Sequence, residues 1–252
     1  FSPGLDHRAP TCMRYPQAIP HAYSIDINKC SNIDELVKVC KAGAILPEDT
    51  QKYREIEAGS IVLAPGAEVI DVDNLDSLGH AFYPDVITSL EYERILSASG
   101  PTQGKLIRPS DGKRPEKIAW IQCAGSRSIQ EGAVSYCSNA CCMFALKEAM
   151  VTKERFQDTI ETSIFYMDMR TFGKDYESYL NRAKNDYNVR LIRSRPHTVL
   201  KDPETESLSL MYTQDSSNSN ITENFDMVVL SAGFKVSDNA RELAVKLGVD
   251  LN

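Results

Sequence analysis

The chain lacks a long hydrophobic run, an excess of positive charge and paired histidines. No apolar stretch approaches the roughly 20 residues that span a bilayer, so we expect no direct membrane span. The net charge of −7 over 252 residues argues against a nucleic-acid partner. The four histidines are scattered, and no two have the i, i+4 spacing of a helical metal site. With 42% hydrophobic and 25% charged residues, the composition predicts a globular protein.

The sequence also lacks the glycine fingerprint of a dinucleotide-binding turn. The apolar run at 118–121 predicts a short buried strand, and residues 141–152 predict a helix. In an ordinary nucleotide-binding unit, glycines between such elements let the pyrophosphate reach the helix N-terminus. Of that fingerprint Gly125 remains, and thiols stand in place of the other glycines. A nicotinamide cofactor is therefore not expected to bind at this turn.

Four of the seven cysteines lie in this stretch with the spacing C-x13-C-x3-C-C, a density typical of a metal site: Cys123, Cys137, Cys141 and Cys142. Four thiolates could hold a structural zinc ion, although zinc sites usually use paired short spacings and a vicinal pair is awkward in a closed tetrahedral site. Disulfides would suit an exported protein, but the cysteine count is odd and we find no apolar signal segment. Buried thiols without a ligand are the remaining alternative.

The segments 122–127 (QCAGSR) and 136–143 (YCSNACCM) resemble the A subunits of heterodisulfide reductases and their relatives in sulfur-oxidising and quinone-interacting complexes. The resemblance covers nearly the whole chain and includes 15–20 (YPQAIP), 83–90 (YPDVITSL), 108–113 (RPSDGK) and 165–170 (FYMDMR). In that family the cysteines at these positions bind a 4Fe-4S cluster. The resemblance therefore implies this role for Cys123, Cys137, Cys141 and Cys142. Such a cluster is an anion, which the N–H groups at a helix start favour.

A second pair, Cys30 and Cys40, occupies the outer positions of the ferredoxin pattern C-x2-C-x2-C-x3-C. The two inner positions are Ile33 and Leu36, which supply no donor atom. The pattern predicts a degenerate ferredoxin-like segment, at about residues 25–50, that has lost its cluster and kept its packing. We therefore expect only one cluster, and we interpret Cys12, Cys30 and Cys40 as core or surface thiols.

Two apolar runs end in small residues and glycine, 61–66 (IVLAPG) and 228–233 (VVLSAG). Each alone predicts a buried strand followed by a tight turn. As a pair they resemble the crossings between domains in flavoproteins related to thioredoxin reductase. The resemblance implies that Ala64, Pro65, Gly66 and Gly233 lie near FAD, since glycine lets backbone approach a ligand closely.

The order of predicted elements indicates an α/β fold. Thr88 or Ser89 caps a helix over 88–96, and Gly100 ends it. From residue 117 the pattern alternates between strand and helix, with later strands at 163–169 and 189–192 around a helix at 176–183, which predicts parallel strands with crossover helices. Segments 207–212 and 225–230 flank a Ser/Asn-rich turn and predict a hairpin.

We therefore predict two dinucleotide-binding-like domains, as in thioredoxin-reductase-type flavoproteins, with the degenerate ferredoxin-like insert. Pro109, Gly112 and Pro115 indicate a linker, so we place a boundary at 114. Residues 1–114 would belong to the FAD-binding domain, 115–233 would be a pyridine-nucleotide-domain-like unit carrying the cluster, and 234–252 would return to the FAD domain. Because the chain begins at Phe1 with a proline-containing stretch, we interpret it as a fragment.

The preferred hypothesis is an oxidoreductase subunit that passes electrons between FAD and a 4Fe-4S cluster. Arg127 beside the cysteines would stabilise the reduced, more negative cluster. No catalytic serine, histidine and carboxylate constellation is evident. We expect a cytoplasmic protein whose partners are other subunits of a heterodisulfide-reductase-like or quinone-linked complex. The alternative is a non-catalytic assembly module with a structural metal site made of four cysteines.

Overall fold

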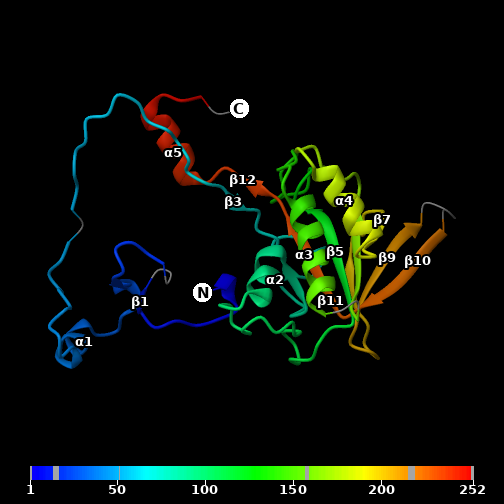
Figure 1. Cartoon of the computed structure of the whole chain (residues 1–252), viewed down its shortest axis with the longest axis horizontal. Coiled ribbons are helices and arrows are strands. Elements are labelled where there is room, and N and C mark those ends of the chain that lie inside the picture. Colours follow the sequence, from blue (N-terminus) through cyan, green and yellow to red (C-terminus); the bar gives the residue numbers. More distant parts are fainter. Residues whose placement is uncertain (1, 14–16, 51, 157–158, 215–218, 251–252) are drawn as a thin grey trace. The chain divides into compact units, whose positions relative to one another are not determined.

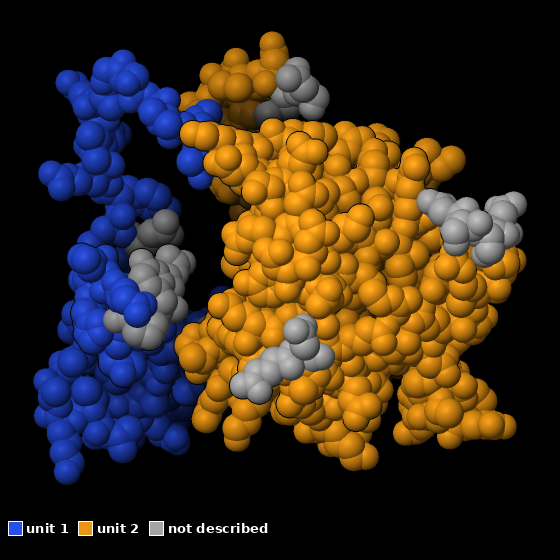
Figure 2. Space-filling view, turned by 45° about the vertical axis from the view of Figure 1, so that its right-hand side comes forward, with its two compact units in different colours: residues 1, 3–64 blue, residues 2, 65–252 orange. Residues whose placement is uncertain are grey.

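The computed structural model describes residues 2–13, 17–50, 52–156, 159–214 and 219–250. The chain divides between Ala64 and Pro65 into two compact units, coloured separately in Figure 2. This division differs from the boundary expected at residue 114, because strand β4 (Val86–Thr88) pairs with β11 (Met227–Ala232) in the sheet that carries the cysteine turn. The assignment of 1–114 and 234–252 to an FAD-binding domain stays a prediction.

The first unit has short elements: β1 (Thr11–Met13), β2 (Tyr23–Ile25), the 3-10 helix η2 (Ile27–Lys29) and α1 (Ile33–Val39). Strands β1 and β2 pair antiparallel. The four ferredoxin positions Cys30, Ile33, Leu36 and Cys40 are half-buried, whereas every other residue of 30–40 is exposed. The four positions therefore share one face, and the ferredoxin-like character of the segment stays a prediction.

The prediction of a buried strand at 61–66 is wrong. Ile61, Val62 and Leu63 lie in no strand, and their exposed fractions are 68%, 92% and 42%. No described strand pairs with their backbone, so the apolar run has neither a hydrogen-bonded neighbour nor a core to face.

The second unit is built on a five-stranded parallel sheet in the order β4-β11-β5-β6-β7. The remaining three strands are β5 (Lys117–Ala124), β6 (Glu161–Tyr166) and β7 (Arg190–Arg193). Strands β5 and β11 are buried almost throughout, as expected for the centre of a parallel sheet covered on both faces. The sheet confirms the predicted α/β class and the parallel arrangement.

Three helices accompany the sheet, with α2 and α3 packed on its strands and α3 in contact with α4 (Figure 1): α2 (Ser89–Leu96), α3 (Cys141–Phe156) and α4 (Tyr176–Asn185). The predicted cap of α2 is confirmed. Thr88 Oγ1 accepts the N–H of Glu91 at 3.3 Å, and Glu91 Oε2 accepts the N–H of Thr88 at 2.6 Å. This reciprocal capping box places the start of α2 at the end of β4.

The antiparallel sheet β10-β9-β8 packs against the central sheet through a shared apolar core: β8 (Val199–Lys201), β9 (Leu208–Gln214) and β10 (Ser219–Phe225). Phe165 of β6 meets Phe225 edge-on, with ring centroids 5.9 Å apart. The predicted hairpin exists, but its second arm is β10, because residues 227–230 belong to the central strand β11. Part of its predicted turn, 215–218, lies outside the described residues.

Smaller elements complete the described chain: η1 (Ser2–Gly4), β3 (Glu68–Val69), η3 (Asp76–Leu78), β12 (Phe234–Lys235) and α5 (Asp238–Leu247). Strand β12 pairs antiparallel with β3. Among the described helices, none is both long and apolar enough to cross a membrane.

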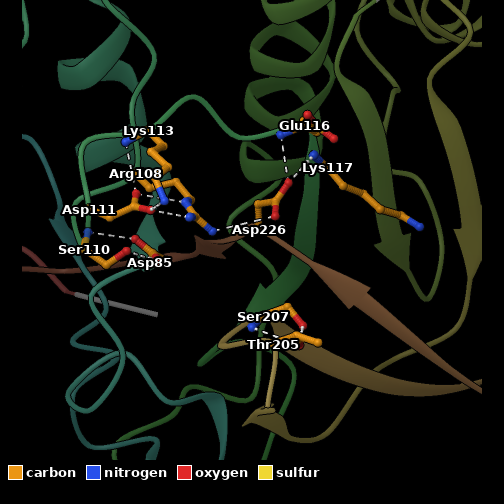
Figure 3. Close-up of polar contacts among 10 residues, drawn as sticks. All are labelled: Asp85, Arg108, Ser110, Asp111, Lys113, Glu116, Lys117, Thr205, Ser207 and Asp226. Carbon is orange, nitrogen blue, oxygen red and sulfur yellow. Dashed lines mark hydrogen bonds and ion pairs between the residues drawn. The ribbon is translucent and has the colours of Figure 1, made fainter. Parts of the chain in front are cut away.

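The stretch expected to be a linker is fastened to the amino end of the central sheet (Figure 3). Asp226, just before β11, accepts the backbone N–H groups of Glu116 and Lys117 at 2.7 and 2.9 Å. Asp85, just before β4, accepts the backbone N–H of Ser110 at 3.0 Å and its hydroxyl at 2.6 Å. These bonds hold 110–117 against the sheet, and the domain boundary at 114 stays a prediction.

Candidate functional site

Cys123 lies at the carboxyl end of β5, where the strand order of the sheet reverses. On one side β5 pairs with β6, which follows it in the chain, and on the other with β11, which comes from near the end. Open α/β sheets bind ligands at the carboxyl edge of such a reversal, because the connections on either side leave in opposite directions. The fold therefore places Cys123 where a nucleotide-binding domain holds its cofactor.

The backbone around Cys123 has an unusual conformation. Its φ angle is 60°, and Gly125 and Arg127 also have positive φ, of 68° and 54°. A non-glycine residue in the left-handed region costs about 1 kcal/mol or more, and such residues concentrate at functional sites. A hydrogen bond from Ser126 N to the Cys123 carbonyl, 3.1 Å long, closes the turn. This tight turn directs the backbone at Cys123 away from the line of β5. Cys123 itself stays buried, at 3% exposed.

A loop returns from this turn to the other three cysteines. Val134 N donates to the carbonyl of Gly125 at 2.8 Å, and Arg127 N donates to the carbonyl of Tyr136 at 3.3 Å. These two hydrogen bonds hold the later part of the loop against its first residues. These bonds bring Cys137 back toward the end of β5.

Cys141 and Cys142 form the first two residues of α3, and both are nearly buried, at 2% and 3% exposed. Asn139 N donates to Cys137 Sγ at 3.3 Å, and the Ser138 hydroxyl lies 3.7 Å from Cys141 Sγ. Backbone N–H groups at the helix start also contact the Cys141 sulfur. The free N–H groups of a helix start favour negative charge, so this position suits a thiolate or an anionic ligand.

The four sulfurs act on one another electrostatically. Burial raises the pKa of the Cys123 and Cys141 thiols and raises that of Cys142 to about 12, and neighbouring cysteines add to each rise. Cys137 is among those neighbours in all three cases. These effects indicate that the four cysteines lie in one neighbourhood, and their role as ligands of one metal site stays a prediction. The raised pKa values favour neutral thiols, whereas metal coordination would favour the thiolates.

The spacing of these donors bears on the kind of metal. Among the described residues, no group of three or more Cys, His, Asp or Glu side chains is arranged so that it could hold a metal ion. A structural zinc ion would draw every sulfur to about 2.3 Å from one point, whereas in a four-iron cluster each thiolate binds a different iron. The choice between a zinc ion and a cluster therefore rests on the metal content of the protein.

Arginines and one carboxylate surround the cysteines. Arg127 forms an ion pair with Asp168 just beyond β6, and Arg170 approaches the same carboxylate at 3.2 Å. Arg127 also interacts with Cys123 and lowers the pKa of that thiol against the effect of burial. The carbonyl of Asp168 lies 4.0 Å from Cys142 Sγ. The predicted placement of Arg127 beside the cysteines therefore agrees with the structure.

Asp168 and Arg170 have no role predicted from the sequence. The signal that could have found them is their position at the end of β6, since neighbouring parallel strands end at the same edge of a sheet. They follow the strand that pairs with β5.

Of the residues expected near FAD, Gly233 lies beside the cysteine turn. A Cβ atom at Gly233 would stand 2.0 Å from the Ser126 hydroxyl oxygen, so any larger residue at Gly233 would overlap the Ser126 side chain as it lies here. Gly66 has a φ of 76° with nothing within 4 Å of a Cβ added there. Ala64 and Pro65 are exposed beside it. Strand β3, which follows Gly66, pairs with β12 beside Gly233, and Ile70 N donates to the Gly233 carbonyl at 2.9 Å. The flavin role of Ala64, Pro65, Gly66 and Gly233 stays a prediction.

No family model matches the sequence. The chain is 40% identical over 253 residues to the iron-sulfur A subunit of CoB–CoM heterodisulfide reductase from Methanocaldococcus jannaschii, covering 100% of this chain and 38% of that protein. It is 41% identical to the A subunit of the H2/formate:CoB–CoM heterodisulfide,ferredoxin reductase from Methanococcus maripaludis, covering 99% and 38%. The chain belongs to the family of heterodisulfide reductase A subunits. It spans about 38% of the length of these relatives, so the match is to one part of a longer protein.

Likeness to solved structures is distant. L-lysine 6-monooxygenase from Pseudomonas syringae aligns with a TM-score of 0.40 at 9% identity, over 64% of this chain and 43% of that one. Thioredoxin reductase from T. acidophilum aligns with a TM-score of 0.37 at 9% identity, over 69% and 44%. The strand order of the central sheet, and not these likenesses, therefore defines the site.

Proposed function

We propose that this part of a heterodisulfide reductase A subunit binds a 4Fe-4S cluster through Cys123, Cys137, Cys141 and Cys142. The observation that carries the proposal is the position of Cys123 at the carboxyl end of β5, where the strand order reverses, with Cys141 and Cys142 at the start of α3. The relative from M. jannaschii is called an iron-sulfur subunit, which supports the same assignment.

A bound cluster supplies one-electron storage and transfer, whose potential depends on nearby charge and solvent. The chain supplies the environment. The N-terminus of α3 and Arg127 stabilise negative charge. Phe144, in the first turn of α3, packs edge-on against Phe234 with centroids 5.9 Å apart.

The wider activity that we propose is that of an oxidoreductase subunit passing electrons between FAD and the cluster. Ala64, Pro65, Gly66 and Gly233 would contribute to the flavin site, with further residues from the rest of the protein. The partners would be other subunits of a heterodisulfide-reductase-like or quinone-linked complex, and the names of the relatives support the former. The alternative function is an assembly module with a structural four-cysteine metal site, and metal content distinguishes the two.

The test is the metal content of the purified chain, prepared without oxygen. The proposal predicts iron and acid-labile sulfide in roughly equal amounts, at about four of each per chain, with a broad visible band that bleaches on reduction. Zinc without colour would support the assembly module. Neither metal after reconstitution with iron and sulfide would contradict both.

A further inference from the structure

A second feature borders the cysteine turn on the sheet face that β8, β9 and β10 cover. A cavity of about 210 Å³ opens beside residues 121–125. Residues 195–198 and the side chains of Leu75 and Leu78 also line it. Ile121 belongs to the core shared with the antiparallel sheet, which places the cavity on the face opposite α3.

The wall of the cavity carries cationic and neutral polar groups and no carboxylate among the described residues. Its polar side chains include Arg195, His197, Gln130 and Ser77, together with the backbone of the cysteine turn. The chain as a whole carries a net charge of −7, yet the residues that line this cavity include no acidic side chain. Such a recess attracts small anions, because a guanidinium presents several donors in a fixed plane to carboxylate, phosphate or sulfonate oxygens.

Arg195 is held in place by uncharged partners. Its Nη2 donates to the carbonyl of Ser126 at 3.4 Å, and its Nη1 lies 3.8 Å from the sulfur of Met167. No carboxylate of the described chain lies within 4.0 Å of it, unlike Arg127 and Arg170, which share Asp168. The guanidinium is half-buried, positioned and without a counter-ion among the described residues.

We propose that this cavity is a binding site for a small anion carrying a carboxylate, phosphate or sulfonate group, with Arg195 as its main anchor. Gln130 and His197 at the rim supply further donors. The bound anion lies against Cys123, so its charge disfavours addition of an electron at the cysteine site. The last consequence rests on the proposed cluster, whereas anion binding itself does not.

The binding test uses isothermal titration of the purified chain with inorganic phosphate, acetate and methanesulfonate, which separate the three oxygen chemistries. We expect at least one to bind with a dissociation constant on the order of 1 mM or tighter. Arg195→Gln should weaken that binding about tenfold or more, because a charged hydrogen bond is replaced by a neutral one. Arg193→Gln is the matched control, since Arg193 is exposed, donates to the carbonyl of Met167 and does not line the cavity.

A second variant keeps the proposal testable if Arg195→Gln folds poorly. Gln130→Glu adds a carboxylate to the exposed rim without touching the core, and it should weaken anion binding while Arg195 stays in place. Absence of binding by all three anions, or equal binding by wild type and both cavity variants, would overturn the site. In cluster-loaded protein the anion should also lower the midpoint potential. A chain that binds the anion but no cluster would retain this site and refute only the cluster assignment.

Discussion

The indole N–H of Trp120 donates a 2.7 Å hydrogen bond to Glu148 Oε2 in the buried layer between β5 and α3. Trp120 precedes Cys123 on the strand, and Glu148 follows Cys142 on the helix, so this bond joins the two elements that carry three of the four cysteines. Glu148 is 3% exposed, and its second oxygen has no hydrogen-bond partner. Burial raises the pKa of this carboxyl well above its ordinary value of 4.5.

The first prediction concerns the pH dependence of stability. Glu148 binds its proton more tightly in the folded protein than in the unfolded chain, so its contribution is complete below about pH 4.5 and is lost as the pH rises toward the folded pKa. Glu148→Gln keeps the acceptor for Trp120 and cannot ionise. Urea unfolding between pH 4 and 9 should therefore show the variant gaining stability relative to wild type as pH rises. A difference independent of pH would show that the carboxyl stays ionised in the fold.

The second prediction concerns the cluster ligands. Cys137→Ala should leave the fold largely intact, because this cysteine is only half-buried in a loop, but it should abolish a stable 4Fe-4S centre by leaving one iron without a thiolate. Cys12→Ala is the control, since Cys12 lies in β1 of the other compact unit. Iron content and the visible spectrum are measured for Cys137→Ala and for Cys12→Ala. Full iron and an unchanged spectrum in Cys137→Ala would refute its assignment as a ligand.

The third prediction uses the charges beside the cysteines. Arg127→Gln should make the midpoint potential of the cluster more negative, by on the order of 50 mV, because a cation that favours the reduced state is lost. Asp168→Asn should move it in the opposite direction, since Arg127 and Arg170 lose their shared carboxylate. Redox titration followed by visible absorbance measures both shifts. Shifts of the same sign in the two variants would contradict an electrostatic cause.

The fourth prediction tests the contact between the end of β11 and the cysteine turn. Gly233→Ala should destabilise the protein by about 1–3 kcal/mol, because its Cβ would overlap the Ser126 oxygen. Ser126→Ala alone should cost little, since that buried hydroxyl has no hydrogen-bond partner. The double variant should recover much of the loss, because the closest remaining contacts stand at 3.2 and 3.3 Å. Denaturant unfolding of all four proteins gives the coupling, and additive losses would rule out the overlap.

The fifth prediction is that the cluster-loaded chain binds neither NADH nor NADPH. The pyrophosphate of either would need glycine-rich backbone at the end of β5, where this chain has Cys123 and a loop bonded to its own start. Calorimetric titration is the measurement. Micromolar affinity for NADH or NADPH that is lost on changing residues of the turn would show that this domain binds pyridine nucleotides.

The sequence could predict those elements whose own residues determine them. Thr88 and Glu91 cap α2 within one turn, and the alternation of apolar strands with helices after Lys117 is sufficient for a parallel sheet. The family resemblance predicted the four cysteine ligands, and the structure places Cys123 at the end of β5 and Cys141 and Cys142 at the start of α3.

The sequence could not predict features that depend on distant partners. The run Ile61–Leu63 is as apolar as β11, yet a strand also needs neighbours for its backbone, and among the described residues it has none. The ion pair of Arg127 with Asp168 joins the ends of two strands, and the fit of Gly233 on Ser126 joins β11 to the cysteine turn. Spacing within one segment carries no information about these contacts.

The place of β11 in the sheet has a consequence for assembly of the protein during synthesis. This strand lies between β4 and β5 but leaves the ribosome long after both, because it begins at Met227 whereas β5 ends at Ala124. Until it inserts, β4 and β5 have no common neighbour, and Gly233 is not yet packed on the cysteine turn. The long sequence separation makes this closure slow compared with the formation of helices. In a nascent chain the cysteine turn therefore forms before β11 packs on it, and the proposed cluster would find its complete surroundings only after β11 has joined the sheet.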